Sequence, residues 1–165
     1  MKKFQFFILI MFFSSFLFSS EHPDDEIKVQ KTGSISAVYL TGIGCPNCAK
    51  TDPVILQETL SMNPELFIFE YEVYKQKEQN REIALSYLKS FFPDESAAIP
   101  VLILDKENCE MGKWNVFALA EEIEYFEHSP FITADGKTEI KFEDLDLTTL
   151  PGLPKIWHKN RVLVK

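Results

Sequence analysis

Residues 34–48 read SISAVYLTGIGCPNC, and this stretch decides the fold class. Its first part, residues 34–40, is rich in β-branched and aromatic side chains, which predicts a buried strand. A turn follows, and then a C-x-x-C motif that runs from Cys45 to Cys48. A helix is predicted over residues 46–61, because a proline at position 64 pushes the residue before it out of helical backbone. A pair of cysteines is therefore expected between a strand and a helix.

The chain continues to alternate between the two kinds of element. Further strands are predicted over residues 66–74 and 101–104, and helices over residues 78–92 and 115–127, the last with Asn115 as its N-cap. A tight turn and a short strand are expected within residues 106–114. Alternation of this kind predicts an α/β fold, a central mixed sheet with parallel pairs and helices on its faces.

Four segments are expected along the chain. Residues 1–20 are predicted to be a signal peptide, residues 21–34 a linker, residues 35–128 the α/β domain and residues 129–165 a C-terminal extension. The pattern of the extension is weak. It suggests a strand over residues 138–142, and its last residues, 161–164, fit either a terminal strand or a disordered end.

The N-terminus has the pattern of an export signal. Lys2 and Lys3 precede an apolar run over residues 4–18, and two small serines follow. The run is shorter than the roughly 20 apolar residues that span a bilayer, so a secretory signal is favoured over a membrane helix. Phe18 stands where signal cleavage prefers a small residue, so an uncleaved membrane anchor remains the alternative. We expect a periplasmic, extracellular or lumenal protein.

Composition excludes several classes of protein. The 165 residues carry 17 Lys and Arg against 25 Asp and Glu, a net charge of -8, which disfavours nucleic-acid binding. Hydrophobic residues make up 45%, which excludes disorder of the whole chain. The 3 cysteines are too few for a disulfide-stapled scaffold or a four-cysteine zinc site. We expect a monomer without a metal or an organic cofactor.

The C-x-x-C motif is expected to carry redox chemistry. Cys45 is predicted at a helix N-terminus, where backbone N–H groups and the helix dipole stabilise a thiolate. Pro46 suits the first helical position, which needs no N–H group. Cys48 lies one turn further in, close enough to form a disulfide and more buried. Two alternatives stay open, half of a metal site and an inert pair. The alternative function is a binding module whose dithiol holds a partner or a metal such as Cu(I) without turnover.

With these residues in place, the chain resembles the thioredoxin superfamily. The C-P-x-C motif is similar to that of glutaredoxins, and Pro53 lies eight residues after Cys45, where members of the superfamily commonly have a proline. Ala98-Ile99-Pro100-Val101 resembles the loop of the superfamily in which a cis-proline precedes a central strand. The resemblance covers about residues 35–128. It implies a thioredoxin-like three-layer sandwich, in which Ile99 and Pro100 bind substrate beside the dithiol.

The activity that this resemblance implies is thiol–disulfide exchange. Cys45 would attack a disulfide of a protein substrate, and Cys48 would resolve the mixed disulfide. The stretch Glu72-Val73-Tyr74 with Asn80 resembles domains of exported proteins, some of them fused to membrane electron carriers. The expected partners are therefore protein dithiols or disulfides and a redox partner, with a membrane electron-transfer protein as a candidate. The direction of electron flow is left open.

The sequence also departs from the family pattern. Gly44 stands where thioredoxins carry Trp, and Tyr39 stands where they often have a buried acid that moves protons. Glu70 and Glu72 are predicted to lie on a solvated strand face, because carboxylates are rarely buried. Cys109 is expected to be a bystander, because no activating cation lies near it. The three histidines and the basic stretch around Trp157 are expected to be solvated.

Overall fold

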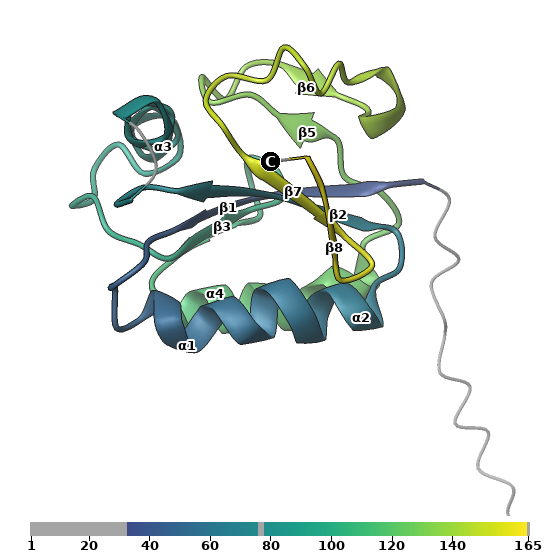
Figure 1. Ribbon diagram of the computed structural model, residues 1–165, viewed down its shortest axis with the longest axis horizontal. Helices are drawn as coiled ribbons and strands as arrows, with labels where there is room; N and C mark the ends of the chain where they lie inside the picture. The colour runs from purple at the N-terminus through teal and green to yellow at the C-terminus, as the bar shows by residue number, and fades with distance from the viewer. Residues whose placement is uncertain (1–32, 76–77, 165) are drawn as a thin grey trace, which may run out of the picture.

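The computed structural model of the chain describes residues 33–75 and 78–164 (Figure 1). The expected signal peptide and all but the end of the expected linker lie outside the described residues. The strands and helices are β1 (Ile35–Thr41), α1 (Cys48–Pro53), a π-helical segment (Val54–Thr59), α2 (Leu60–Met62), β2 (Leu66–Glu72), α3 (Glu78–Phe91), β3 (Val101–Ile103), β4 (Cys109–Met111), α4 (Lys113–Glu122), β5 (Phe131–Ile132), β6 (Glu139–Ile140), β7 (Lys155–His158) and β8 (Arg161–Val164).

These elements form a mixed α/β fold around a six-stranded sheet of order β4-β3-β1-β2-β7-β8. β1 and β2 are parallel, and the other neighbours in the sheet pair antiparallel. In Figure 1 the sheet separates α1, α2 and α4 on one side from α3 and the β5–β6 hairpin on the other. The mixed sheet flanked by helices is the arrangement that the sequence predicted.

The core has two halves, one on each face of the sheet. All seven residues of β1 are buried, which explains why its sequence reads as a nearly continuous apolar run. Because side chains alternate along a strand, Ile35, Ala37 and Tyr39 enter one core cluster with α4, and Val38 and Leu40 enter the other. β1 is therefore fixed in the centre of the sheet, and the loop that carries Cys45 starts from its end.

The helix after the dithiol is continuous but irregular. It was predicted over residues 46–61. Regular α-helix begins only at Cys48, and the helical run ends at Met62. Pro53 lies inside it and has no N–H group to donate. The residues that follow, Val54–Thr59, adopt π-helical hydrogen bonding, which accommodates the break in the regular ladder.

The predicted N-cap of α4 is wrong. Gly112 is the N-cap, at φ 90°, and Asn115 lies inside the helix, where its Nδ2 donates to the Met111 carbonyl. Glycine adopts this positive φ without a steric penalty, so the helix starts earlier than the apolar periodicity suggested. The Gly112 N–H donates to the Pro100 carbonyl at 2.8 Å, which ties the start of α4 to the proline loop.

The C-terminal extension is part of the main sheet. β7 pairs with β2 and β8 pairs with β7, so the first alternative for residues 161–164, a strand, is the one observed. β6 is shorter than the strand predicted over residues 138–142. Phe131, Ile132 and Ile156 are fully or almost fully buried. The sequence did not predict β7, and its pairing with β2 changes the surroundings of two acidic residues described below.

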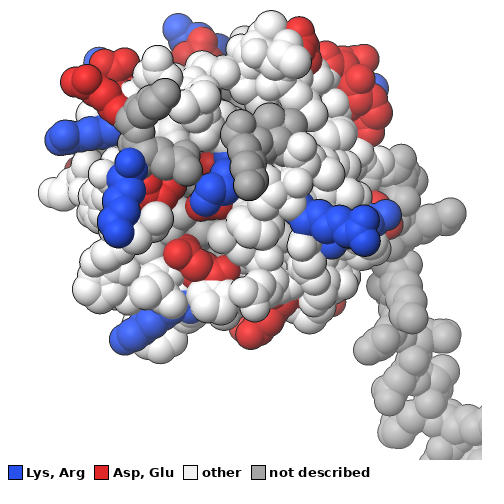
Figure 2. All heavy atoms as spheres, viewed as in Figure 1, with Lys and Arg blue, Asp and Glu red and all other residues white. Residues whose placement is uncertain are grey.

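The described residues contain no helix that is long and apolar enough to cross a membrane. On the face drawn in Figure 2, the coloured Lys and Arg side chains are scattered among acidic and uncharged ones rather than gathered in one patch.

Candidate active site

The two cysteines of the C-x-x-C motif differ in exposure. Cys45 is partly exposed, Cys48 is completely buried, and both are free thiols. The Ala49 N–H donates to the Cys45 carbonyl at 3.0 Å, so the helical hydrogen bonds begin at Cys45 even though regular helix begins at Cys48. Pro46 lies within this first turn, where no donor is required of it. The predicted placement of Cys45 at the start of a helical segment therefore agrees with the hydrogen-bond pattern.

The Cys45 sulfur faces the backbone of that first turn. Its Sγ accepts a hydrogen bond from the Cys48 N–H at 3.2 Å, as an N-cap side chain does. Backbone N–H groups at the start of a helical segment are the groups that bind anions. The arrangement thus offers a donor to any negative charge on the Cys45 sulfur.

The buried cysteine is held as a thiol. Burial, followed by its hydrogen bond with Cys45, raises the pKa of Cys48 to about 12. The third cysteine, Cys109 on β4, also has a raised pKa, because it is partly desolvated and because Glu110 and Asp105 lie near it. The acidic residues around Cys109 disfavour its thiolate form, so Cys109 remains a predicted bystander.

This difference predicts the order in which the thiols react. A raised pKa lowers the thiolate fraction at any pH below it, so at pH about 7 we expect iodoacetamide to label Cys45 first, Cys109 more slowly and Cys48 last. Peptide mass spectrometry over a time course measures the order. Denatured protein is the control, in which the three cysteines should react at similar rates. Fastest labelling at Cys109 would contradict the assignment.

The loop before β3 lies against the dithiol. The peptide bond between Ile99 and Pro100 is cis, the isomer that the resemblance implied. The Ile99 carbonyl oxygen lies 3.9 Å from the Cys45 Sγ, and Pro100 is buried. Both residues expected to bind substrate are thus in the loop beside the reactive sulfur, with Ile99 in contact with it.

A cavity of about 600 Å³ opens beside this loop. It is lined by the residues after β2, by α3 and by the proline loop: Val73, Tyr74, Glu78, Arg81, Ala84, Leu85, Leu88, Ala97, Ala98 and Ile99. Gly42, just after β1, packs against two residues of the cavity wall, Tyr74 and Ile99. A Cβ atom on Gly42 would come within 2.7 Å of both the Ile99 and the Tyr74 side chains. Glycine at this position lets the dithiol loop and the cavity wall pack together.

Glu72 is buried, which corrects the prediction of a solvated strand face. Its side chain lies at the end of β2 and is 1% exposed. The Ile43 and Tyr74 N–H groups donate to its Oε1 at 2.9 and 3.0 Å, and the Lys75 N–H donates to its Oε2 at 2.7 Å. Backbone donors compensate the burial of the carboxylate. Glu72 therefore fastens the loop before Cys45 to the end of β2.

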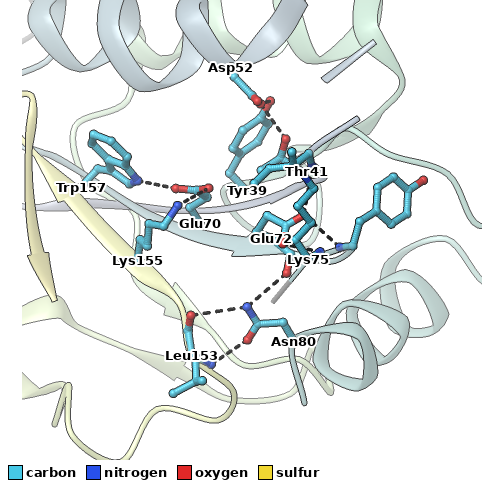
Figure 3. Close-up of polar contacts among 12 residues, drawn as sticks. Tyr39, Thr41, Asp52, Glu70, Glu72, Lys75, Asn80, Leu153, Lys155 and Trp157 are labelled. Carbon is cyan, nitrogen blue, oxygen red and sulfur yellow. Dashed lines mark hydrogen bonds and ion pairs between the residues drawn. The ribbon is translucent and has the colours of Figure 1, made fainter. Parts of the chain in front are cut away.

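Asn80 extends this connection to the C-terminal extension. Its Nδ2 donates to the Glu72 carbonyl at 3.2 Å, and its Oδ1 accepts from the Leu153 N–H at 2.7 Å (Figure 3). Gly152 lies so close that a Cβ atom there would be 2.9 Å from Asn80 Oδ1. One buried amide thus joins α3, β2 and the segment that leads into β7.

Glu70 is buried as well, for a different reason. The side chain is paired with two residues of β7, Lys155 through its Nζ at 3.3 Å and Trp157 through its Nε1 at 2.6 Å (Figure 3). The stretch around Trp157 was predicted to be a solvated tail, and this is wrong because β7 covers the edge of β2. His158 is not solvated either, since its ring stacks on Phe67.

A third acidic residue, Asp52, lies on α1, the helix that starts at Cys48, and the sequence analysis did not single it out. Its Oδ1 accepts hydrogen bonds from the Tyr39 hydroxyl at 2.8 Å and the Thr41 hydroxyl at 2.6 Å (Figure 3). The available signal was its spacing, because residues four apart on a helix share a face and Asp52 lies four residues after Cys48. Tyr39 is completely buried in the place where the resemblance implied an acid.

Two further observations concern possible metal ligands and similarity to known proteins. Within residues 33–75 and 78–164, no group of three or more His, Cys, Asp or Glu side chains is arranged to hold a metal ion. Comparison of the chain with protein-family models, with curated proteins and with solved structures finds no match.

Proposed function

We propose that the chain is an exported thiol–disulfide oxidoreductase with a thioredoxin-like fold that acts on protein dithiols and disulfides. One observation carries the proposal. The partly exposed Cys45 sulfur accepts a hydrogen bond from the N–H group of the buried Cys48. It also lies beside the carbonyl oxygen of Ile99, the residue that precedes the cis-proline. A reactive thiol, a resolving thiol and a surface for the substrate chain are thus in contact.

The strand arrangement supports the proposed fold. The dithiol follows β1, β1 and β2 are parallel, and β3 and β4 complete the sheet antiparallel on the other side of β1. A cis peptide bond directly precedes β3. These are the features that the resemblance implies for residues 35–128, and β5 to β8 are additions to them.

The proposed reaction needs no group beyond the chain itself. The Cys45 thiolate attacks one sulfur of the substrate disulfide, and the other substrate sulfur leaves as a thiolate. Cys48 then attacks the Cys45 sulfur, which releases the first substrate sulfur. The substrate disulfide gains two electrons and two protons, and Cys45 and Cys48 become a disulfide. The reverse sequence oxidises a substrate dithiol.

The cavity beside Ile99 supports a polypeptide as substrate. Most of the residues that line it are apolar, Ala84, Leu88 and Ile99 among them, and its volume of about 600 Å³ exceeds that of one side chain. A substrate chain that crosses Ile99 and Pro100 could place residues next to its cysteine in this cavity. Export, which the N-terminal pattern predicts, would bring the protein to disulfide-bonded substrates.

Reduction of insulin disulfides by dithiothreitol tests the proposal. We expect the protein to accelerate insulin precipitation over dithiothreitol alone, and an equal amount of protein alkylated at Cys45 to have no effect. Absence of acceleration, together with binding of Cu(I) at the reduced dithiol, would favour the binding-module alternative instead.

A further inference from the structure

The cavity between α3 and the proline loop adjoins the reactive cysteine. Ile99 belongs to both, since it lines the cavity and its carbonyl oxygen lies 3.9 Å from the Cys45 Sγ. A disulfide holds the Cα atoms of its two cysteines about 4.4–6.8 Å apart, and the next residue of a chain lies about 3.8 Å further on. A residue one or two positions from a cysteine that is bonded to Cys45 can therefore reach this cavity.

The walls of the cavity leave room for a large apolar side chain. Three of the lining residues are alanines, Ala84 on α3 and Ala97 and Ala98 in the proline loop, and the volume is about 600 Å³. Two large lining residues are themselves open to solvent, Tyr74 at 62% and Leu85 at 49% exposure. Large side chains that stay exposed around a cavity are typical of a surface that a ligand covers.

The two charged residues of the cavity do not favour a charged ligand. Glu78 and Arg81 both lie on α3, three positions apart, where side chains of a helix are neighbours. Their charges are opposite, so together they contribute no net charge. A charged side chain would lose hydration on entering the apolar part of the cavity. An aromatic or long aliphatic side chain would instead be stabilised there by burial.

We propose that this cavity is a specificity site, which binds a large apolar side chain next to the reacting cysteine of a substrate polypeptide. This inference rests on the proposed function. Exchange takes place at Cys45, and the cavity determines which cysteines react efficiently with it. Large apolar side chains are mostly buried in folded proteins. The expected substrates are therefore polypeptides in which a cysteine and an apolar neighbour are still exposed.

Short peptides that each contain one cysteine test the preference. The cysteine is joined by a disulfide to thionitrobenzoate, and the residues on both sides of it are Phe, Ala or Glu. In a Cys109→Ser background the Cys45 thiolate attacks the peptide sulfur, and the coloured thionitrobenzoate leaves because the thiol of lower pKa leaves faster. The rate constant of release is divided by that of dithiothreitol with the same peptide. We expect the Phe peptide to react about tenfold faster than the Ala peptide, and the Glu peptide no faster than the Ala peptide.

Two cavity variants and one matched control locate the preference. Leu85→Ser removes an apolar wall, and Ala98→Leu fills part of the space from an exposed position, so each should lower the ratio of the Phe rate to the Ala rate by about threefold. Leu163→Ser is the control, because Leu163 is 48% exposed on β8, outside the cavity, and it should keep the ratio.

The outcomes separate this inference from the proposed function. Equal normalised rates for the Phe and Ala peptides, a preference for the Glu peptide, or an unchanged ratio in both cavity variants would overturn the specificity site. Thionitrobenzoate release no faster than that of Cys45→Ser with every peptide would instead contradict the proposed function.

Discussion

Replacing Cys45 with serine is expected to abolish disulfide exchange, whereas replacing Cys48 with serine should stop the reaction half-way. A serine hydroxyl is not ionised near neutral pH and is a far weaker nucleophile than a thiolate. Insulin reduction by Cys45→Ser should therefore fall to the rate of dithiothreitol alone. In Cys48→Ser the partly exposed Cys45 still attacks, but nothing resolves the product, so a stable mixed disulfide with the substrate should accumulate.

Non-reducing electrophoresis and mass spectrometry measure the trapped complex. Only Cys48→Ser should carry a covalently bound substrate chain, and dithiothreitol should release it. Cys109→Ser is the matched control, since Cys109 lies on β4 with a raised pKa, and it should exchange disulfides at the wild-type rate. Full activity of Cys45→Ser, or a trapped complex that needs Cys109, would contradict the roles assigned to the C-x-x-C motif.

The sequence was sufficient to predict those features that depend on local patterns. β1 is buried on both faces, so its apolar run identified a central strand directly. The spacing of Cys45 and Cys48 predicted their unequal exposure, because it places the second cysteine one helical turn further into the protein. These predictions needed no knowledge of which distant segments meet.

Features that depend on distant segments could not be predicted in this way. Glu70 reads as a solvated carboxylate until β7 supplies Lys155, which lies 85 residues away in the chain. The basic residues around Trp157 look like a solvated tail for the same reason. Asp52 is an ordinary helical acid until β1 presents Tyr39 and Thr41 to it. In each case a polar residue that looks solvated from its neighbours in sequence is contacted by partners that are distant in the chain.

Glu72 is the polar residue whose removal should affect the fold most. Its carboxylate accepts three backbone N–H groups, those of Ile43, Tyr74 and Lys75, although only 1% of the residue is exposed. A buried donor without a partner costs about 1–3 kcal/mol. Glu72→Ala should therefore lower the free energy of unfolding by about 3 kcal/mol, which corresponds to a fall in Tm of roughly 10 °C.

The same substitution should slow exchange, because Glu72 is what holds Ile43, two residues before Cys45, against the end of β2. Glu72→Gln keeps an oxygen that can accept the Ile43 N–H, so its loss of stability should be smaller than that of Glu72→Ala. Glu121→Ala removes an exposed carboxylate from α4 and should change Tm by little. Calorimetry of the three variants measures the effect. Equal Tm values for Glu72→Ala and Glu121→Ala would mean that water replaces the carboxylate at no cost, and the anchor assigned to Glu72 would then be wrong.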